Sequence, residues 1–179
     1  FVEGSHQVSD GIAWASGSAQ VKASGSAQVK ASGSATVKAS GSATVWAYDS
    51  ATIRASGSAH VEAYDSATVW AYDSAHVEAY GSARVEAYDS AQVWACDSAR
   101  VWAHVSAQVW ARGSARVWAH GFALVRTPPS AWGQPTVVTY DAAVWVDYRS
   151  GVPAVHTAEG RCEPVASGLC DRQRKDGER

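Results

Sequence analysis

The chain has 179 residues, and its formal net charge of −2 argues against a uniformly basic nucleic-acid-binding protein while leaving room for a local basic patch. Nine Trp stand beside two Phe and no Met, so we expect a processed chain or a fragment of a longer one. No apolar run approaches the roughly 18 residues of a membrane span, and we expect neither a membrane segment nor a signal peptide.

Residues 1–18 approach an eight-residue repeat that becomes strict at Ala19. Residues 11–18, GIAWASGS, already keep its frame, with Ala13 at the position that a valine takes later. Residues 3–10, EGSHQVSD, keep the frame only loosely. Terminal repeats of a solenoid are usually atypical because they close an open edge. We therefore predict a repeat domain over residues 1–126 that is regular from residue 11.

Thirteen octads with the consensus Ala-x-Val-x-Ala-[Ser/Tyr]-[Gly/Asp]-Ser follow, the first starting at Ala19 and the last at Ala115. Ala, Val and Ala alternate with polar or aromatic residues, and this period of two is typical of a half-buried strand. The Gly or Asp that follows tolerates turn dihedral angles. Each octad is predicted to form a five-residue strand and a three-residue corner. A helix would spread the Ala and Val around its circumference, so we exclude one.

The first outward position of each octad indicates how many octads make one coil. Identities along this position number 3 of 12 between adjacent octads, 6 of 11 between every second octad and 1 of 10 between every third octad. Like residues prefer to stack on neighbouring coils, so two octads per coil are predicted. A recent tandem duplication of two octads would leave the same pattern.

The predicted fold is therefore all-β, a flattened parallel β-solenoid with 16-residue coils and a C-terminal cap. About seven coils, stacked ~4.8 Å apart, give a length of about 30 Å. Only Val and Ala face the interior, so stability must come from backbone ladders and from stacking between neighbouring coils.

The C-terminal part breaks the repeat. Pro128 and Pro129 cannot donate to a ladder, and a degenerate octad returns in YDAAVWVDYRS, four residues out of frame. We predict a cap with two or three short strands over residues 127–160 and a charged, disordered tail over residues 161–179. Three cysteines are too few for a disulfide scaffold, and both a Cys162–Cys170 disulfide and free thiols remain open.

Trp recurs at the second outward position, and we single out the last four as a candidate interaction surface. If one coil is two octads, Trp94 stacks on Trp110 on one face, and Trp102 stacks on Trp118 on the other. Three interpretations remain open. The rings stabilise the sheets as a ladder, form a self-association surface, or offer a platform on which a sugar or another polymer stacks.

A column of like charges completes this candidate surface, formed by Arg84, Arg100 and Arg116. Adjacent cations repel, so such a column suggests an anionic neighbour, for example a nucleic acid strand or an acidic glycan held beside Trp102 and Trp118. The alternative is a solvated face eased by Glu86 and by the Asp residues of the corners.

His and Tyr also recur in columns. His60 and His76 alternate with Glu62 and Glu78 on a flat face, where we expect solvated side chains and no metal ion. The same holds for the corner residues His104 and His120. A column of Tyr48, Tyr64 and Tyr80 is predicted to stack along the other corner, where it could also line a dimer edge.

No nucleophile elbow, phosphate loop or metal motif is present. A repetitive array offers many equivalent positions, whereas catalysis needs one distinct pocket. We therefore expect no enzymatic activity and no cofactor.

The corner AYGSA, residues 79–83, resembles the octad of bacterial ice nucleation proteins, which also nest eight residues within sixteen. In both, Arg stands in late coils where earlier coils carry Thr. In that family the Arg coils are implicated in assembly and paired Thr in ordering water. The paired Thr positions correspond here to Ala83 and Val85, which we expect inside. A closer likeness is to SAxVxAY(D/G) repeat proteins of actinobacteria and their phages, which brings no activity.

These patterns together predict a structural or adhesive repeat module that self-associates through Trp, Tyr and Arg ladders. The first alternative is a module that binds a polysaccharide or another anionic polymer, and the second is an ice-binding protein. The expected partners are copies of the chain, similar solenoids or a glycan. The compartment stays open, with the cell surface, the extracellular space or a virion favoured.

Overall fold

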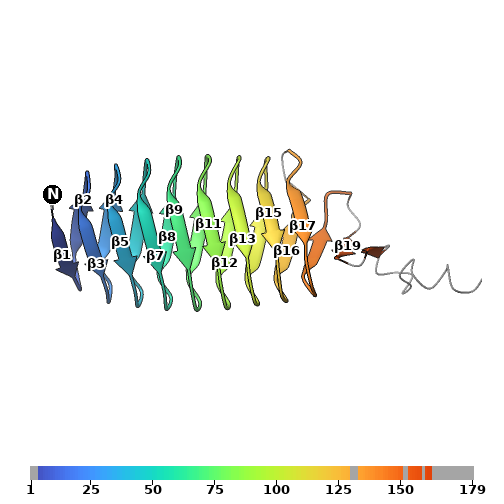
Figure 1. Cartoon of the computed structure of the whole chain (residues 1–179), viewed down its shortest axis with the longest axis horizontal. Coiled ribbons are helices and arrows are strands. Elements are labelled where there is room, and N and C mark those ends of the chain that lie inside the picture. The colour runs from blue at the N-terminus through green and yellow to red at the C-terminus, as the bar shows by residue number, and fades with distance from the viewer. Residues whose placement is uncertain (1–3, 130–132, 151–152, 159, 163–179) are drawn as a thin grey trace, which may run out of the picture.

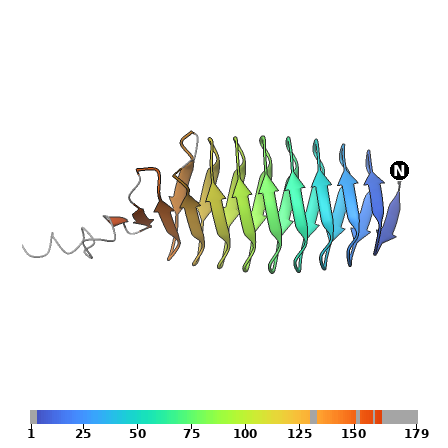
Figure 2. The same ribbon diagram turned by 180° about the vertical axis from the view of Figure 1, so that it is seen from behind.

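The computed structural model describes residues 4–129, 133–150, 153–158 and 160–162. In this part of the chain there are strands, turns and bends but no helix. The strands stack as coils in a single row along the long axis, from β1 and β2 at the N-terminal end to β17 and β18 at the other, as the front and rear views show (Figures 1 and 2). The protein is an all-β parallel solenoid, which confirms the predicted fold class.

Two sheets form the walls of the solenoid. Sheet B contains β1 (Ser5–Val8), β3 (Gln20–Ala23), β5 (Thr36–Ala39), β7 (Thr52–Ala55), β9 (Thr68–Ala71), β11 (Arg84–Ala87), β13 (Arg100–Ala103), β15 (Arg116–Ala119) and β17 (Thr136–Thr139). Sheet A contains β2 (Ile12–Ala15), β4 (Gln28–Ala31), β6 (Thr44–Ala47), β8 (His60–Ala63), β10 (His76–Ala79), β12 (Gln92–Ala95), β14 (Gln108–Ala111), β16 (Leu124–Thr127) and β18 (Val144–Asp147). Two further strands, β19 (Ala154–Thr157) and β20 (Gly160–Cys162), extend sheet A.

From β1 to β18, consecutive strands of the chain alternate between the two sheets, so one coil contains two octads. In sheet A, His76 pairs with His60 on one side and with Gln92 on the other. In sheet B, Arg100 pairs with Arg84 and with Arg116. Each partner lies two octads away along the chain, which confirms the coil length inferred from the pattern of identities.

The strands are one residue shorter than expected. In the corner after β3, the amide of Ala27 donates to the carbonyl of Ser24 at 3.2 Å. The first Ala of the octad therefore closes a turn and does not open a strand, which leaves four residues for β4. The same bond recurs in other corners, for example from Ala99 to the carbonyl of Cys96 at 3.1 Å.

The corners need a residue that accepts a positive φ, which explains why they carry Gly or Asp. The φ angle is 64° at Gly81 and 53° at Asp97, which occupies the same position one coil later. The Asp97 carboxylate also accepts a hydrogen bond from the Gly81 amide at 3.0 Å. The same Asp-to-amide bond links Asp49 to Gly33 and Asp73 to Gly57, both at 2.9 Å. An Asp corner thus satisfies a backbone donor of the preceding coil.

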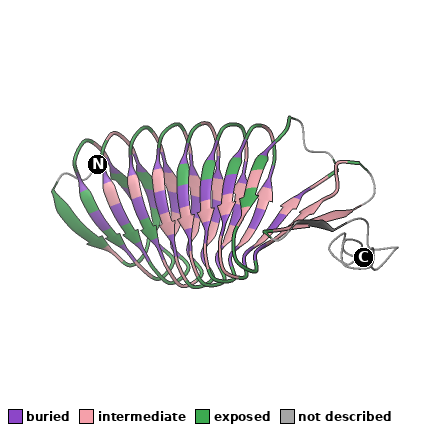
Figure 3. Cartoon of the chain, turned by 45° about the vertical axis from the view of Figure 1, so that its right-hand side comes forward, coloured by how far each residue is buried: buried purple, intermediate pink, exposed green. Residues whose placement is uncertain are grey.

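Among the described residues the apolar core is made of Ala and Val, with Ile53 as the one larger apolar side chain that is fully buried. Buried and less buried positions alternate along every central strand (Figure 3). Ala83 and Val85 are both fully buried, as the sequence predicted. Because an Ala–Val core is thin, the many short contacts between coils must supply most of the stability.

The solenoid is longer than the roughly seven coils expected from the regular octads. In the described part of the chain sheet B has nine strands, because the degenerate ends also form strands. β1 lies in the loosely repeated N-terminal segment and pairs with β3. At the other end β17 and β18 pair with β15 and β16 through partners such as Arg116 and Thr136, which are four positions further apart than partners in the regular coils. The four extra residues fall between β16 and β17.

The stack of parallel strands ends in sheet A with a change of direction. β19 pairs antiparallel with β18, and β20 pairs antiparallel with β19. The segment expected as a cap, residues 127–160, therefore contains one further coil, β17 and β18, followed by antiparallel strands. Residues 163–179 of the predicted tail lie outside the described residues, as do the side chain of Cys162 and all of Cys170.

Candidate functional site

The structure brings the predicted Trp pairs together as stacked rings. The ring centroids of Trp94 and Trp110 lie 4.5 Å apart with planes 8° from parallel. Those of Trp102 and Trp118 lie 4.9 Å apart at 11°. All four side chains are half-buried. Each pair therefore uses ring faces for contacts within the chain, as the ladder interpretation predicts.

On sheet A the Trp pair is part of a longer column. His60 stacks on His76 at 5.0 Å, and His76 lies 4.0 Å from the Trp94 ring. At the other end, the guanidinium of Arg126 lies 5.5 Å from the Trp110 ring centroid. Both faces of Trp94 and both faces of Trp110 thus have neighbours. A sugar that stacks on an aromatic side chain needs an open face, so this column offers little to the stacking-platform interpretation.

The Arg column lies on sheet B as predicted. Arg84, Arg100 and Arg116 are exposed and occupy directly paired positions on β11, β13 and β15. Glu86, expected to ease this column, accepts a hydrogen bond from the Tyr88 hydroxyl at 2.8 Å, and this bond raises the pKa of Tyr88 to about 12. In the described residues one ion pair joins Arg149 to Asp147, and the His60 imidazole lies 4.0 Å from the Glu62 carboxylate, so no carboxylate forms a close ion pair with this column.

The sequence interpretation missed a second cationic column on the same sheet. Lys22, Lys38 and Arg54 occupy paired second outward positions on β3, β5 and β7. They border an open groove of about 410 Å³, lined by Gln7, Lys22, Ala23, Ser24, Lys38, Ala39, Ser40, Arg54, Ala55, Ser56 and Tyr72. The comparison of every second octad, applied to the second outward position as well as the first, would have revealed this column. We call the groove that these cations border the basic groove.

Exposed apolar side chains gather at the C-terminal coils, and the sequence interpretation missed these too. Phe122 is 75% exposed and Val105 is 50% exposed, and the Phe122 amide donates to the Val105 carbonyl at 2.6 Å. Val138 and Tyr140, one coil further on, are exposed as well. We call these four residues the apolar corner. Its signal in the sequence is the loss of the consensus: Val105 replaces Gly or Asp, and Phe122 replaces Ser.

Val105 is also in an unusual backbone conformation. Its φ is 60°, whereas every other non-glycine residue with positive φ in the described ranges is an Asp. A β-branched residue is strained there, and such strain tends to mark functional positions. Its strained φ and its exposed side chain together single out Val105 as a candidate contact residue.

A second groove lies at the N-terminal end, on sheet A. Its volume is about 400 Å³, and Ile12, Trp14, Gln28, Lys30, Trp46 and Tyr48 line it. Ile12 and Trp14 are exposed, and the Lys30 ammonium lies 5.9 Å from the Trp46 ring centroid. We call it the aromatic groove.

The predicted corner columns are stacked rings. Tyr48, Tyr64 and Tyr80 follow one another at 5.1 and 5.2 Å along one corner. Along the other, rings 4.3–5.3 Å apart form one column of Tyr72, Tyr88, His104, His120 and Tyr140. Burial and the neighbouring His120 lower the pKa of His104, and Glu86 only partly offsets them.

The carboxylates of the His and Glu face are engaged by tyrosines. Tyr64 donates to Glu62 at 2.6 Å, and Tyr80 donates to Glu78 at 2.5 Å. The bond to Glu62 raises the pKa of Tyr64 to about 12. Across the described residues, no cluster of three or more His, Cys, Asp or Glu side chains could hold a metal ion.

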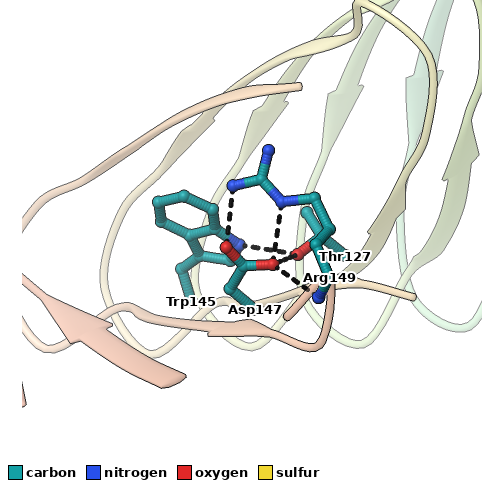
Figure 4. Close-up of polar contacts among 4 residues, drawn as sticks. All are labelled: Thr127, Trp145, Asp147 and Arg149. Atoms are coloured by element: carbon teal, nitrogen blue, oxygen red, sulfur yellow. Dashed lines mark hydrogen bonds and ion pairs between the residues drawn. The ribbon is translucent and has the colours of Figure 1, made fainter. Parts of the chain in front are cut away.

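A polar cluster links the paired strands β16 and β18 to Arg149, which follows β18 (Figure 4). The Thr127 hydroxyl and the Arg149 guanidinium both donate to Asp147, at 2.7 Å each, and the Trp145 indole donates to Thr127 Oγ1 at 3.3 Å. The hydrogen bonds from Arg149 hold the pKa of the Asp147 carboxyl well below its usual range. Because these groups bond to one another, the cluster is suited to ending the stack and not to binding a substrate.

Comparison with protein-family models, with curated proteins and with solved structures finds no match to this chain. The search of the described residues for a helix long and apolar enough to cross a membrane also finds none. The candidate surfaces must therefore be judged on their own geometry.

Outward threonines are relevant to the ice-binding alternative. Thr36, Thr52 and Thr68 form a column on sheet B, but the second outward residue of each of these strands is Lys, Arg or Trp. No described strand presents two outward Thr side by side. This geometry gives the ice-binding alternative no support.

Proposed function

We propose that the chain is a non-enzymatic structural repeat module whose copies associate with one another. The observation that carries this proposal is the apolar corner. Large apolar side chains exposed together on a protein surface usually mark a contact site. Here Val105 and Phe122 are exposed although the octad consensus would place small or polar residues at both positions.

The aromatic groove at the opposite end supplies a complementary surface. In the described ranges, six large apolar side chains are exposed, and the two outside the apolar corner are Ile12 and Trp14. A contact between two different surfaces of the same chain is heterologous, and it propagates into a filament unless it closes into a ring. We therefore propose that the apolar corner of one copy packs into the aromatic groove of the next, which suits a structural or adhesive role.

Sedimentation velocity between 1 and 100 μM tests the proposal. We expect the parent chain to grow in size with concentration. Val105→Asp combined with Phe122→Ser restores the octad consensus, so the fold should be retained and the variant should be monomeric. Ile12→Ser combined with Trp14→Thr should also be monomeric, because it removes the other half of the contact.

Mixing the two variants separates this arrangement from its rivals. Each keeps one intact surface, so an equimolar mixture should form a heterodimer and grow no further. If the apolar corner paired with itself, the groove variant alone would remain dimeric.

The Trp ladders remain the competing interpretation of self-association. Replacement of Trp94, Trp102, Trp110 and Trp118 by Thr should leave the particle size unchanged if the apolar corner carries the contact. A parent chain that stays monomeric at 100 μM would overturn the proposal, and a particle that shrinks only in the Trp variant would move the contact to the ladders.

A further inference from the structure

We propose that the basic groove on sheet B binds an acidic polysaccharide, a linear glycan with a carboxylate on successive sugars. The groove lies on the opposite sheet from the aromatic groove and at the opposite end from the apolar corner, so this site is independent of the self-association proposed above.

The spacing of the cations suits a regular polyanion. Lys22 pairs with Lys38, and Lys38 pairs with Arg54, so one cation projects from each of three successive coils. Coils lie ~4.8 Å apart, the distance between neighbouring strands. The groove therefore offers a positive charge at regular intervals along the solenoid axis, which a polymer with one negative charge per unit can follow.

The outward strand positions of sheet B carry an excess of positive charge. The outward positions of its nine strands hold six cations, namely Lys22, Lys38, Arg54, Arg84, Arg100 and Arg116, against the single carboxylate of Glu86. The corresponding positions of β2 to β18 in sheet A hold two cations, Lys30 and Arg126, and two carboxylates, Glu62 and Glu78. Like charges on adjacent strands destabilise a sheet. Sheet A has one such carboxylate pair, Glu62 and Glu78, whereas sheet B has two runs of three paired cations, so an anionic ligand would relieve the larger cost there.

The remaining lining favours a glycan over a nucleic acid. Ser24, Ser40 and Ser56 line the groove at the corner, one on each coil. The Ser40 and Ser56 hydroxyls donate to backbone carbonyls of the preceding coil at 3.4 and 3.5 Å, so each keeps an oxygen that can accept from a donor such as a sugar hydroxyl.

Single-stranded nucleic acids need aromatic faces on which bases stack. The lining includes one aromatic residue, Tyr72, which stacks on Tyr88. The neighbouring Trp70 ring already carries the Arg54 guanidinium, 5.7 Å from its centroid. The groove thus has charges and hydroxyls but lacks a row of open rings.

Isothermal titration of the full chain with oligogalacturonate tests the site, with neutral maltooligosaccharide and oligo-dT as comparison ligands. We expect binding to oligogalacturonate that weakens as salt is added, and no binding to the neutral glycan. Replacement of Lys22, Lys38 and Arg54 by Gln should weaken binding by about tenfold or more. Circular dichroism establishes that the variant is folded.

Two control variants locate the site. Lys30→Gln removes a cation from sheet A and should leave the affinity unchanged. Replacement of Arg84, Arg100 and Arg116 by Gln removes the same number of charges from sheet B outside the groove, and should weaken binding less than the groove variant does.

Three results would overturn the proposal. The first is no binding to oligogalacturonate, and the second is tighter binding to oligo-dT, which would identify a nucleic acid site. The third is a larger loss in the Arg84, Arg100 and Arg116 variant than in the groove variant. If the groove variant fails to fold, Lys38→Gln alone replaces it in these comparisons, because Lys38 stands between Lys22 and Arg54. Its affinity for oligogalacturonate should still be lower than that of the parent chain.

Discussion

The Thr127 hydroxyl donates a 2.7 Å hydrogen bond to Asp147, its partner on the next strand of sheet A. In earlier coils both positions belong to the second inward Ala of the octad. Thr127 is fully buried, so its hydroxyl requires a partner, and Asp147 supplies one while accepting from Arg149. The apolar stack therefore ends in a bonded polar cluster that another Ala–Val coil could not match.

Asp147→Ala should destabilise the C-terminal end of the solenoid. The change leaves the buried Thr127 hydroxyl without its acceptor and removes the partner of Arg149, a loss of roughly 1–3 kcal/mol. Thermal and urea unfolding measure it. Asp147→Asn, which keeps an acceptor for Thr127, should lose less, and an alanine variant as stable as the parent would contradict this account of the cluster.

Asp97→Gly tests the corner carboxylates. Glycine tolerates the positive φ at this position, so the variant loses the hydrogen bond from the Gly81 amide, a cost of about 0.5–1.5 kcal/mol, and the greater freedom of glycine in the unfolded chain adds to the loss. Asp97→Ala should lose more, because Ala is also strained at this φ. Asp97→Asn, which accepts a hydrogen bond and tolerates the conformation, should stay near the parent. If all three variants were equally stable, the hydrogen bond at the corner would not be a source of stability.

The sequence alone predicted most of the fold, because the repeat applies one physical rule many times. Alternation of Ala and Val with polar residues identified the buried face, and the recurrence at every second octad identified the partners of each strand. The predicted number of coils was too small. β1 and β18 keep only part of the octad, yet they pair with regular neighbouring strands, and this pairing overrides their weak sequence patterns.

The candidate surfaces were harder to predict. The sequence correctly predicted which Trp and Arg residues stand in the same column, because that depends only on the coil length. Sequence could not show that His76 and Arg126 cover the outer faces of the Trp94 and Trp110 pair, because those contacts depend on how the side chains lean between coils. The apolar corner was missed because Val105 and Phe122 each depart from the consensus in a single octad. A comparison that looks for identical residues between octads passes over such isolated differences.

Acidification should destabilise the protein through its stacked histidines. Burial and the adjacent His120 lower the pKa of His104, so the folded state binds fewer protons than the unfolded state near the ordinary value of 6.5. Stability is then fully present above pH 6.5 and declines as the pH falls through the lower folded pKa. His76, whose pKa burial and His60 lower in the same way, adds to the effect.

His104→Tyr is the matched variant for this pH dependence, because Tyr88 and Tyr140 already stand in the same column. We expect the fall in Tm between pH 7.5 and pH 5.5 to be smaller in the variant, and smaller again when His76→Gln is added. A fall in Tm that is the same in parent and variants would show that these histidines do not control the acid response.

Two deletions test the 16-residue coil itself. Removal of residues 99–114 takes out β13 and β14, one whole coil, so β15 can pair with β11 and β16 with β12 in their own sheets. Val117 then pairs with Val85, and the polar cluster around Asp147 remains at the end of sheet A. Only one interface between neighbouring coils is lost.

Removal of residues 99–106 takes out half a coil and moves every later strand to the opposite sheet. The longer corner between β16 and β17 then lies on the wrong side, and the antiparallel strands β19 and β20 extend sheet B instead of sheet A. We expect the eight-residue deletion to unfold at the lower temperature although it removes less protein. Thermal unfolding of both variants by circular dichroism measures the difference. Equal stabilities, or a lower Tm for the longer deletion, would contradict the coupling between coil length and capping, because only a coil of two octads makes the shorter cut the more disruptive one.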